Sequence, residues 1–122
     1  MKSEKGKKSS STMREMLQEL NEAYEMMSLS APEYFKNFMD LFDSAERKGI
    51  LTEKIKELIS IALAINSHCK PCIAFHVNNA IDNRATKQEI IEVCKVAVLM
   101  GGSPSFVYIK YVLDACEEFG AE

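Results

Sequence analysis

Apolar residues recur every three or four positions along most of the chain, which is the period of an amphipathic helix. The first apolar stripe, rich in methionine, runs from Thr12 to about Met27, and a second follows the helix start at Pro32. Residues 58–65 are apolar on nearly every face, which is typical of a helix inside a core. Three more helical patterns cover residues 71–84, 86–100 and 103–119. The pattern therefore predicts an all-α fold of about six helices.

Helix-end signals mark several of these boundaries. Thr86 and Glu89 form a capping box, in which the hydroxyl and the carboxylate each cover a free amide of the first turn. Gly49 predicts a left-handed cap that closes the second helix. No linker or internal repeat interrupts the helical patterns. We therefore expect one helical domain over residues 12–122, preceded by a polar tail over residues 1–11.

The composition excludes several classes of protein. With 47% hydrophobic and 27% charged residues, the chain is too apolar for a disordered protein, and its 5 Gly and 3 Pro are too few for a sandwich or barrel. The net charge of −3 is unlike that of a nucleic-acid binder, and no apolar run approaches the roughly 18 residues of a membrane span. No secretory signal is visible, so we expect a cytoplasmic protein. In that reducing compartment, close cysteines more often bind metal or do redox chemistry than staple a fold.

The segment from Glu57 to His76 carries the candidate chemistry. Cys69, Cys72 and His76 are separated by three and four residues, which places their side chains on one face of a helix. A helix that begins near Pro71 would bring both sulfurs to its N-terminus. The partial positive charge there is the setting that lowers the pKa of a cysteine thiol.

The third and fourth helices are expected to fold back on each other about residues 66–67. Glu57 and His76 are equidistant from that junction, so we expect them to meet across an antiparallel helical hairpin. A carboxylate beside an apolar stretch is costly to bury without a partner, and an imidazole is a suitable partner. The predicted order in space is Glu57, His76 and Cys72, with Cys69 one turn away and nearer the surface.

This order predicts a relay that activates a thiol. An imidazole within hydrogen-bond reach can take the thiol proton, and a carboxylate behind it orients the ring and stabilises its cation. The resulting thiolate can attack a peroxide oxygen and become a sulfenic acid. A second cysteine then condenses with the sulfenic acid to form a disulfide, which an external dithiol must reduce.

The same residues resemble the signature of the carboxymuconolactone decarboxylase / alkylhydroperoxidase-D-like superfamily. That signature is a glutamate, eleven residues, Cys-x-x-Cys, three residues and a histidine. Glu57, Cys69, Cys72 and His76 match it at every spacing. The similarity runs over about residues 32–115 and includes the segments 51–58, 72–76, 85–90 and 100–102.

The resemblance implies an all-helical fold built on the hairpin, assembly into trimers or hexamers, and thiol-dependent peroxidase or disulfide-reductase activity. Cys72 would be the thiol coupled to the relay, Cys69 its disulfide partner, His76 the proton carrier and Glu57 the end of the relay. The substrate would be a small peroxide and the reductant a lipoyl-bearing or thioredoxin-like protein, with no cofactor or bound metal. Alkylhydroperoxidases of this family that have the complete proton relay carry a histidine immediately before the second cysteine. This chain has Pro71 at that position, so one member of the relay is absent.

Other hypotheses stay open at this point. A decarboxylase or lactone-processing activity, the other chemistry of the superfamily, needs no thiols, and a non-catalytic redox-sensing assembly needs no turnover. Cys94 and Cys116 lie on apolar stripes and are expected to pack in the core. A zinc site competes with the redox pair, although adjacent residues rarely both reach one ion. Its four candidate ligands would be His68, Cys69, Cys72 and His76.

Overall fold

The structure, a computed structural model, describes residues 12–122, so the predicted tail over residues 1–11 lies outside the described residues. Six longer helices and one helix of four residues account for all regular secondary structure in the described part, which confirms the predicted all-α fold. No helix in this part is long and apolar enough to cross a bilayer. In chain order the helices are α2 (Met13–Ser30), α3 (Pro32–Glu46), α4 (Glu53–Asn66), α5 (Lys70–Asp82), α6 (Lys87–Gly101), α7 (Ser103–Phe106) and α8 (Ile109–Phe119).

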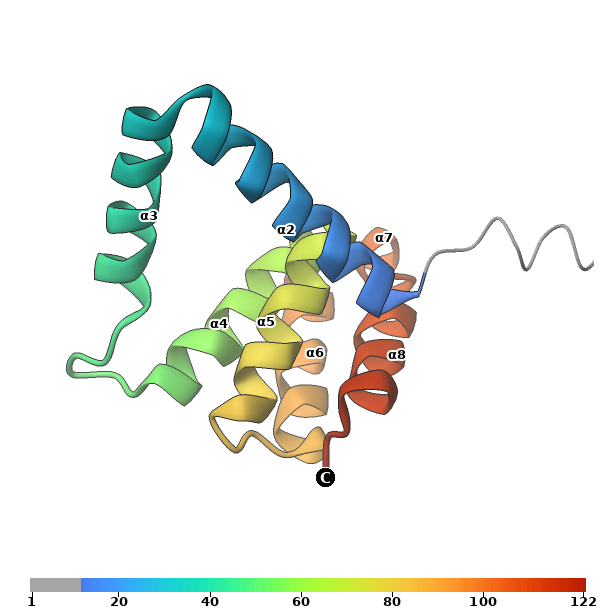
Figure 1. Ribbon diagram of the computed structural model, residues 1–122. Helices are drawn as coiled ribbons and strands as arrows, with labels where there is room; N and C mark the ends of the chain where they lie inside the picture. Colours follow the sequence, from blue (N-terminus) through green and yellow to red (C-terminus); the bar gives the residue numbers. More distant parts are fainter. Residues whose placement is uncertain (1–11) are drawn as a thin grey trace, which may run out of the picture.

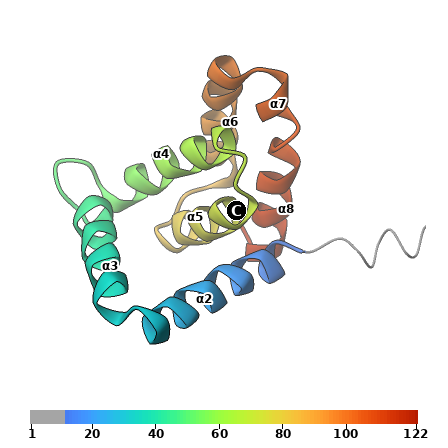
Figure 2. The same cartoon turned by 90° about the horizontal axis from the view of Figure 1, so that it is seen from above.

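The helices α4 and α5 form the predicted hairpin at the centre of the molecule (Figure 1). The outer side of α4 packs against α6, and α5 packs against α2 and α8, so that α5 lies in the middle when seen from above (Figure 2). Burial of these shared apolar faces is the main stabilising contribution to the fold. The side chains with no exposed surface include Ile61, Ile65, Ile73, Val77 and Val112.

The helix α3 stands at the edge of the molecule and packs less closely than the others (Figures 1 and 2). None of its residues is fully buried. Two of its side chains nevertheless reach the hairpin. The ring of Phe42 packs edge-on against Phe75 of α5 at 5.7 Å between centroids, and Glu46 receives a hydrogen bond from Ser60 of α4 at 2.8 Å. The last turn of α3 is therefore placed beside the hairpin.

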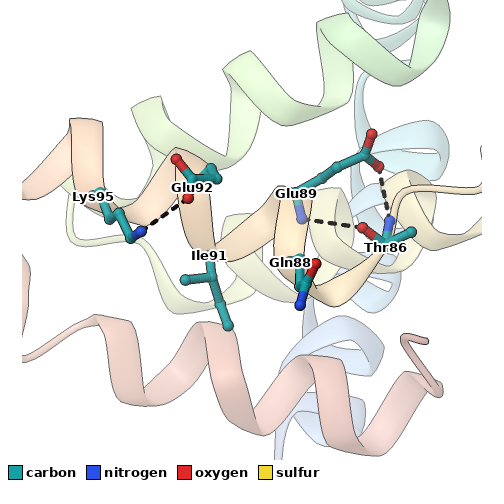
Figure 3. A pocket seen from close by; sticks show the side chains of 6 residues that line it. All are labelled: Thr86, Gln88, Glu89, Ile91, Glu92 and Lys95. Atoms are coloured by element: carbon teal, nitrogen blue, oxygen red, sulfur yellow. Dashed lines mark hydrogen bonds and ion pairs between the residues drawn. The ribbon is translucent and has the colours of Figure 1, made fainter.

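The capping signals at the start of α6 are confirmed. The backbone N–H of Glu89 donates to the Thr86 hydroxyl at 3.1 Å, and the backbone N–H of Thr86 donates to the Glu89 carboxylate at 2.9 Å (Figure 3). At the other end of α6, Gly102 has φ of 73°, a left-handed conformation that favours glycine and ends the helix.

The predicted left-handed cap at Gly49 is wrong. The helix α3 ends at Glu46, Arg47 follows in an extended conformation, and Gly49 is not among the glycines with positive φ. The ammonium group of Lys56 donates to the carbonyls of Ala45 and Arg47, at 2.8 Å and 2.6 Å. The side chain of Lys56 therefore supplies hydrogen bonds to carbonyls at the end of α3, in the place of the backbone bonds that a glycine cap would make.

The predicted helix over residues 103–119 is divided into α7 and α8. Tyr108 lies at the break, and its ring stacks on His68 at 4.8 Å. On the preceding turn, the hydroxyl of Ser105 bonds to the side chain of Asn66. Both contacts join this part of the chain to the hairpin turn. At the break, the backbone N–H groups of Tyr108 and Tyr111 donate to carbonyls three residues earlier, those of Ser105 and Tyr108, at 3.0 Å and 3.1 Å.

Candidate functional site

The hairpin turn places the two cysteines at the start of α5. Cys69 is the N-cap residue of α5, and its sulfur accepts a hydrogen bond from the backbone N–H of Cys72 at 3.2 Å. Pro71 lies in the first turn, where its missing N–H leaves no intrahelical bond unmade. The predicted helix start beside both sulfurs is therefore confirmed.

Cys69 and Cys72 are joined by a disulfide, with 5.2 Å between their Cα atoms. This separation lies within the usual range for a disulfide, so the backbone of the turn holds the two residues ready to pair. Both residues are partly buried. That Cys69 lies nearer the surface than Cys72 stays a prediction.

Glu57 and His76 meet across the hairpin, as predicted. The Nδ1 atom of His76 lies 2.7 Å from Oε1 of Glu57, and the two side chains are 13% and 8% exposed. A carboxylate can only accept a hydrogen bond, so Nδ1 carries the proton of this bond. In the neutral imidazole, Nε2 then has the free lone pair and can act as a base.

Aromatic rings border the imidazole of His76. The ring of Phe42 stacks on it at 6.2 Å between centroids, with 14° between the ring planes, and Phe75 meets it edge-on at 5.1 Å. Apolar neighbours lower the local dielectric, which strengthens the bond to Glu57. The two rings cover part of the imidazole, and the His76 side chain is mostly buried.

His76 and Cys72 open into the same hollow. This hollow has a volume of about 220 Å³ and is lined by Ser60, Leu63, Ala64, Ser67, Cys72 and His76. Its volume is below the range of about 300–1,000 Å³ that drug-sized ligands occupy, so it suits a small substrate. A larger hollow of about 600 Å³ lies over the start of α6 (Figure 3), and none of the four signature residues lines it.

Glu57 faces a second hollow, which is polar. Its volume is about 300 Å³, and Glu57 but not His76 is among its lining residues. The hydrogen-bonded pair therefore lies between two hollows, because His76 lines the one that Cys72 lines and Glu57 lines the one with charged and amide groups. The lining residues of the second hollow are Asp43, Glu46, Arg47, Glu53, Glu57, Asn79 and Asn83.

Glu46 is a residue of this site that the sequence analysis missed. One ligand atom each from Glu46, Glu57 and His76 lie within 4.8 Å of one another. The Oε2 atom of Glu46 accepts from Ser60, whereas its Oε1 atom is buried and has no hydrogen-bond partner. Glu46 lies at the end of a helix outside the hairpin, and no spacing in the sequence relates it to His76.

The alternative zinc ligands are not brought together. The two sulfurs are bonded to each other, His68 stacks on Tyr108, and His76 faces Glu57. Within residues 12–122, the one group of three or more side chains with suitable spacing for a metal ion is Glu46, Glu57 and His76. Two carboxylates and an imidazole are a possible ligand set for a divalent metal, and this set contains none of the cysteines.

Cys94 and Cys116 lie buried in the core, where the sequence analysis placed them. Burial, together with the nearby Cys116, raises the pKa of the Cys94 thiol from 9.0 to about 12. Burial also raises the pKa of Cys116. Both residues are therefore thiols at neutral pH and serve as small packing groups.

Comparisons with known sequences agree with the resemblance drawn from the signature. The family model of the carboxymuconolactone decarboxylase family matches residues 32–115. An uncharacterised protein of Cupriavidus necator is 31% identical over 101 residues, which cover 83% of this chain and 89% of that protein. An uncharacterised protein of the cox locus of Paracoccus denitrificans is 31% identical over 70 residues, which cover 57% and 63%.

Solved structures show the same fold. A carboxymuconolactone decarboxylase family protein from Legionella pneumophila superposes with a TM-score of 0.85 at 34% identity, covering 88% of this chain and 96% of that one. A family protein from Thermotoga maritima superposes with a TM-score of 0.76 at 26% identity, covering 85% and 88%. The description of the Thermotoga protein suggests a part in the antioxidative response.

Proposed function

We propose that this chain, which belongs to the carboxymuconolactone decarboxylase family, is a thiol-dependent peroxidase and disulfide oxidoreductase with an antioxidant role. One observation carries the proposal: His76, which is hydrogen-bonded to Glu57, lines the same hollow as Cys72 of the Cys69–Cys72 disulfide. The carboxylate would be costly to bury without a partner, and the imidazole that supplies it lies four residues after Cys72 on α5. The part in the antioxidative response that is suggested for the Thermotoga relative supports the proposed antioxidant role.

The first step activates Cys72 in the reduced protein. The Nε2 atom of His76 takes the proton of the Cys72 thiol, so an S–H bond breaks and an N–H bond forms. The carboxylate of Glu57 keeps its bond to Nδ1 and stabilises the imidazolium cation that results. A thiolate, unlike a thiol, is a strong nucleophile.

The second step reduces the peroxide. The Cys72 thiolate attacks one peroxide oxygen, the S–O bond forms as the O–O bond breaks, and the alkoxide leaves as an alcohol with the proton from His76. The Cys69 sulfur then attacks the sulfenic acid of Cys72, and the oxygen leaves as water with the proton of the Cys69 thiol. One peroxide and two thiols thus give one alcohol, one water and one disulfide.

The third step resets the protein. An external dithiol attacks the Cys69–Cys72 disulfide and delivers two electrons, so its own sulfurs end as a disulfide. A lipoyl-bearing or thioredoxin-like protein in the cytoplasm has this chemistry, and the cycle needs no other cofactor. Pro71 offers no acid or base beside the pair, so the protons of the cycle depend on His76.

We also propose that the chain assembles into trimers or hexamers. Large apolar side chains are exposed on several helices, and a monomer rarely leaves so much apolar surface in contact with water. Light scattering on the eluted protein would measure the assembly, and a monomer at micromolar concentration would contradict it. The exposed side chains include Leu29, Leu41, Leu63, Val96 and Leu99.

The peroxidase is tested by mixing the reduced protein with cumene hydroperoxide. We expect one hydroperoxide consumed for every two thiols lost, and a Cys69–Cys72 disulfide in the peptide map. Cys72→Ser should abolish consumption, Cys69→Ser should leave a sulfenic acid that dimedone traps, and the core variant Cys94→Ala should retain activity. If the hydroperoxide stays intact and both thiols stay free, the proposal is refuted.

The name of the matched family points to a second chemistry, decarboxylation or lactone processing, which needs no thiol. The double variant Cys69→Ser with Cys72→Ser distinguishes the peroxidase activity from this second activity. It should be inactive as a peroxidase but active on a lactone or carboxylate substrate if that chemistry is the native one. A redox-sensing assembly would instead change its oligomeric state with dithiothreitol and turn over neither substrate.

A further inference from the structure

The carboxylate of Glu46 is only half satisfied. Its Oε2 atom accepts a hydrogen bond from the hydroxyl of Ser60 at 2.8 Å, whereas its Oε1 atom is buried and receives no hydrogen bond within residues 12–122. A buried carboxylate oxygen with no donor is costly, because it has lost water without gaining a replacement. A bound cation would supply the missing partner.

Two further side chains of ligand type lie beside this carboxylate. The helix α3 holds Glu46, α4 holds Glu57 and α5 holds His76, and one ligand atom from each lies within 4.8 Å of the others. The side chains of Glu57 and His76 are only 8% and 13% exposed. A tetrahedral zinc ion, with ligands at about 2.0–2.2 Å, holds its ligand atoms roughly 3.4 Å apart, so small side-chain rotations would close the set.

A polar hollow gives a cation access to these residues. Its volume is about 300 Å³, and Glu46 and Glu57 are both among its lining residues. Two more acids, Asp43 and Glu53, line it as well, against one cation, Arg47, whose side chain is exposed. A concave surface lined mainly by one sign of charge raises the local concentration of counter-ions.

The lysines of α4 do not neutralise this acidic group. The ammonium group of Lys56 donates to the carbonyls of residues 45 and 47 at the end of α3, and that of Lys54 donates to Glu89 at 3.0 Å. Ser60, on the same helix, holds one oxygen of Glu46 in place. An outer hydrogen bond of this kind orients the carboxylates that bind metals.

We propose that Glu46, Glu57 and His76 bind one divalent transition-metal ion of the zinc class, in a site that joins α3 to the hairpin (Figure 1). An imidazole with carboxylates suits zinc, whereas Mg²⁺ takes oxygen ligands and retains several waters. The site contains no cysteine, so it does not depend on the proposed peroxidase. Because the metal takes the place of the hydrogen bond between Glu57 and His76, the metal-bound form and the relay are alternative states of one protein.

The test is calorimetric titration of the oxidised full-length protein with zinc chloride, because the Cys69–Cys72 disulfide then keeps both sulfurs from the metal. We expect one zinc ion per chain and binding of Mg²⁺ that is weaker by about tenfold or more. Loss of an outer partner of a metal site typically costs about 10–100-fold in affinity, so loss of a ligand in Glu46→Gln should weaken zinc binding by at least about 100-fold. Glu57→Gln should cause a similar loss, which keeps the test valid if one variant fails to fold.

Asp43→Asn is the matched control. It removes a charge from the same helix and the same hollow, but Asp43 is outside the three-residue group. We expect its zinc affinity to stay within about threefold of wild type, because water and salt screen a more distant charge. The chain has 2 histidines, so zinc should change the imidazole signals of His76 in a magnetic resonance spectrum and leave those of His68 unchanged.

Three results would overturn the metal site. They are the absence of zinc binding by the wild-type protein, wild-type affinity in Glu46→Gln, and equal losses in Glu46→Gln and Asp43→Asn, which would assign binding to the general charge of the hollow. Hydroperoxide consumption is measured separately, in buffer with a chelator. Zinc binding by a protein that consumes no hydroperoxide therefore supports the site and refutes only the peroxidase.

Discussion

Glu57 and His76 lie 19 residues apart in the chain, on different helices, and their side chains are joined at 2.7 Å. The bond follows from the symmetry of the hairpin, because both residues lie at equal distance from the turn. Cys72 lies one turn before His76 on α5, and both residues line the same hollow.

Removal of the imidazole should affect one cysteine and spare the other. We expect His76→Ala to slow alkylation of Cys72 about tenfold or more near neutral pH, because the thiol loses its proton acceptor. Cys69 should be labelled at its wild-type rate, as shown by mass spectrometry of the labelled peptides. His68→Ala is the control and should leave both rates unchanged. Equal slowing of both cysteines would assign the effect to the helix start instead.

Removal of the charge of Glu57 should lower turnover without loss of the fold. Glu57→Gln keeps a hydrogen-bond acceptor near His76 but no longer stabilises the imidazolium, so we expect hydroperoxide consumption to fall about tenfold to a hundredfold. The control is Glu53→Gln, one turn earlier on α4 and on the same hollow, which should remain within twofold of wild type. Turnover by Glu57→Gln at the wild-type rate would remove Glu57 from the relay.

The buried thiol of Cys94 predicts how stability depends on pH. Its pKa is raised from 9.0 to about 12 in the folded protein, so between these values the unfolded chain releases a proton that the folded chain keeps. The free energy of unfolding should be unaffected by this group below pH 9 and should fall above it, by about 1.4 kcal/mol per pH unit. Urea unfolding of the reduced protein at a series of pH values measures the slope.

Cys94→Ala is the matched variant for this slope. It removes the thiol and keeps the other titrating groups, so its unfolding free energy should fall less steeply above pH 9 than that of wild type. Equal slopes would show that Cys94 ionises as readily in the folded protein as in the unfolded chain.

The last turn of α6 is packed too closely for a side chain. A Cβ atom on Gly101 would clash with Ser105 and Asn66, the residue at the end of α4. We expect Gly101→Ala to lower the free energy of unfolding by about 1–3 kcal/mol. The control Gly49→Ala meets only the end of the Lys56 side chain, at 3.7 Å, and should change stability by less than about 0.5 kcal/mol. Equal stability of the two variants would contradict the close packing.

Local signals in the sequence predicted the helices and much of the site. The apolar period located the six longer helices, the capping box at Thr86 and Glu89 located the start of α6, and the spacing from Glu57 to His76 predicted their contact. These features depend on residues within one helix or one hairpin. The geometry of a helix and a tight turn is the same in any protein, so short-range spacing is enough to predict them.

Only the tertiary structure decided the features that depend on distant segments. The carbonyls at the end of α3 are covered by Lys56 rather than by a cap at Gly49, and the last predicted helix is divided at Tyr108, whose ring stacks on His68 of the hairpin turn. Glu46 lies beside Glu57 and His76 because α3 ends beside the hairpin, although nothing in its local sequence distinguishes it from the other acids of that helix. A periodic pattern says which face of a helix is buried, but the partner of that face is chosen by how the whole chain packs.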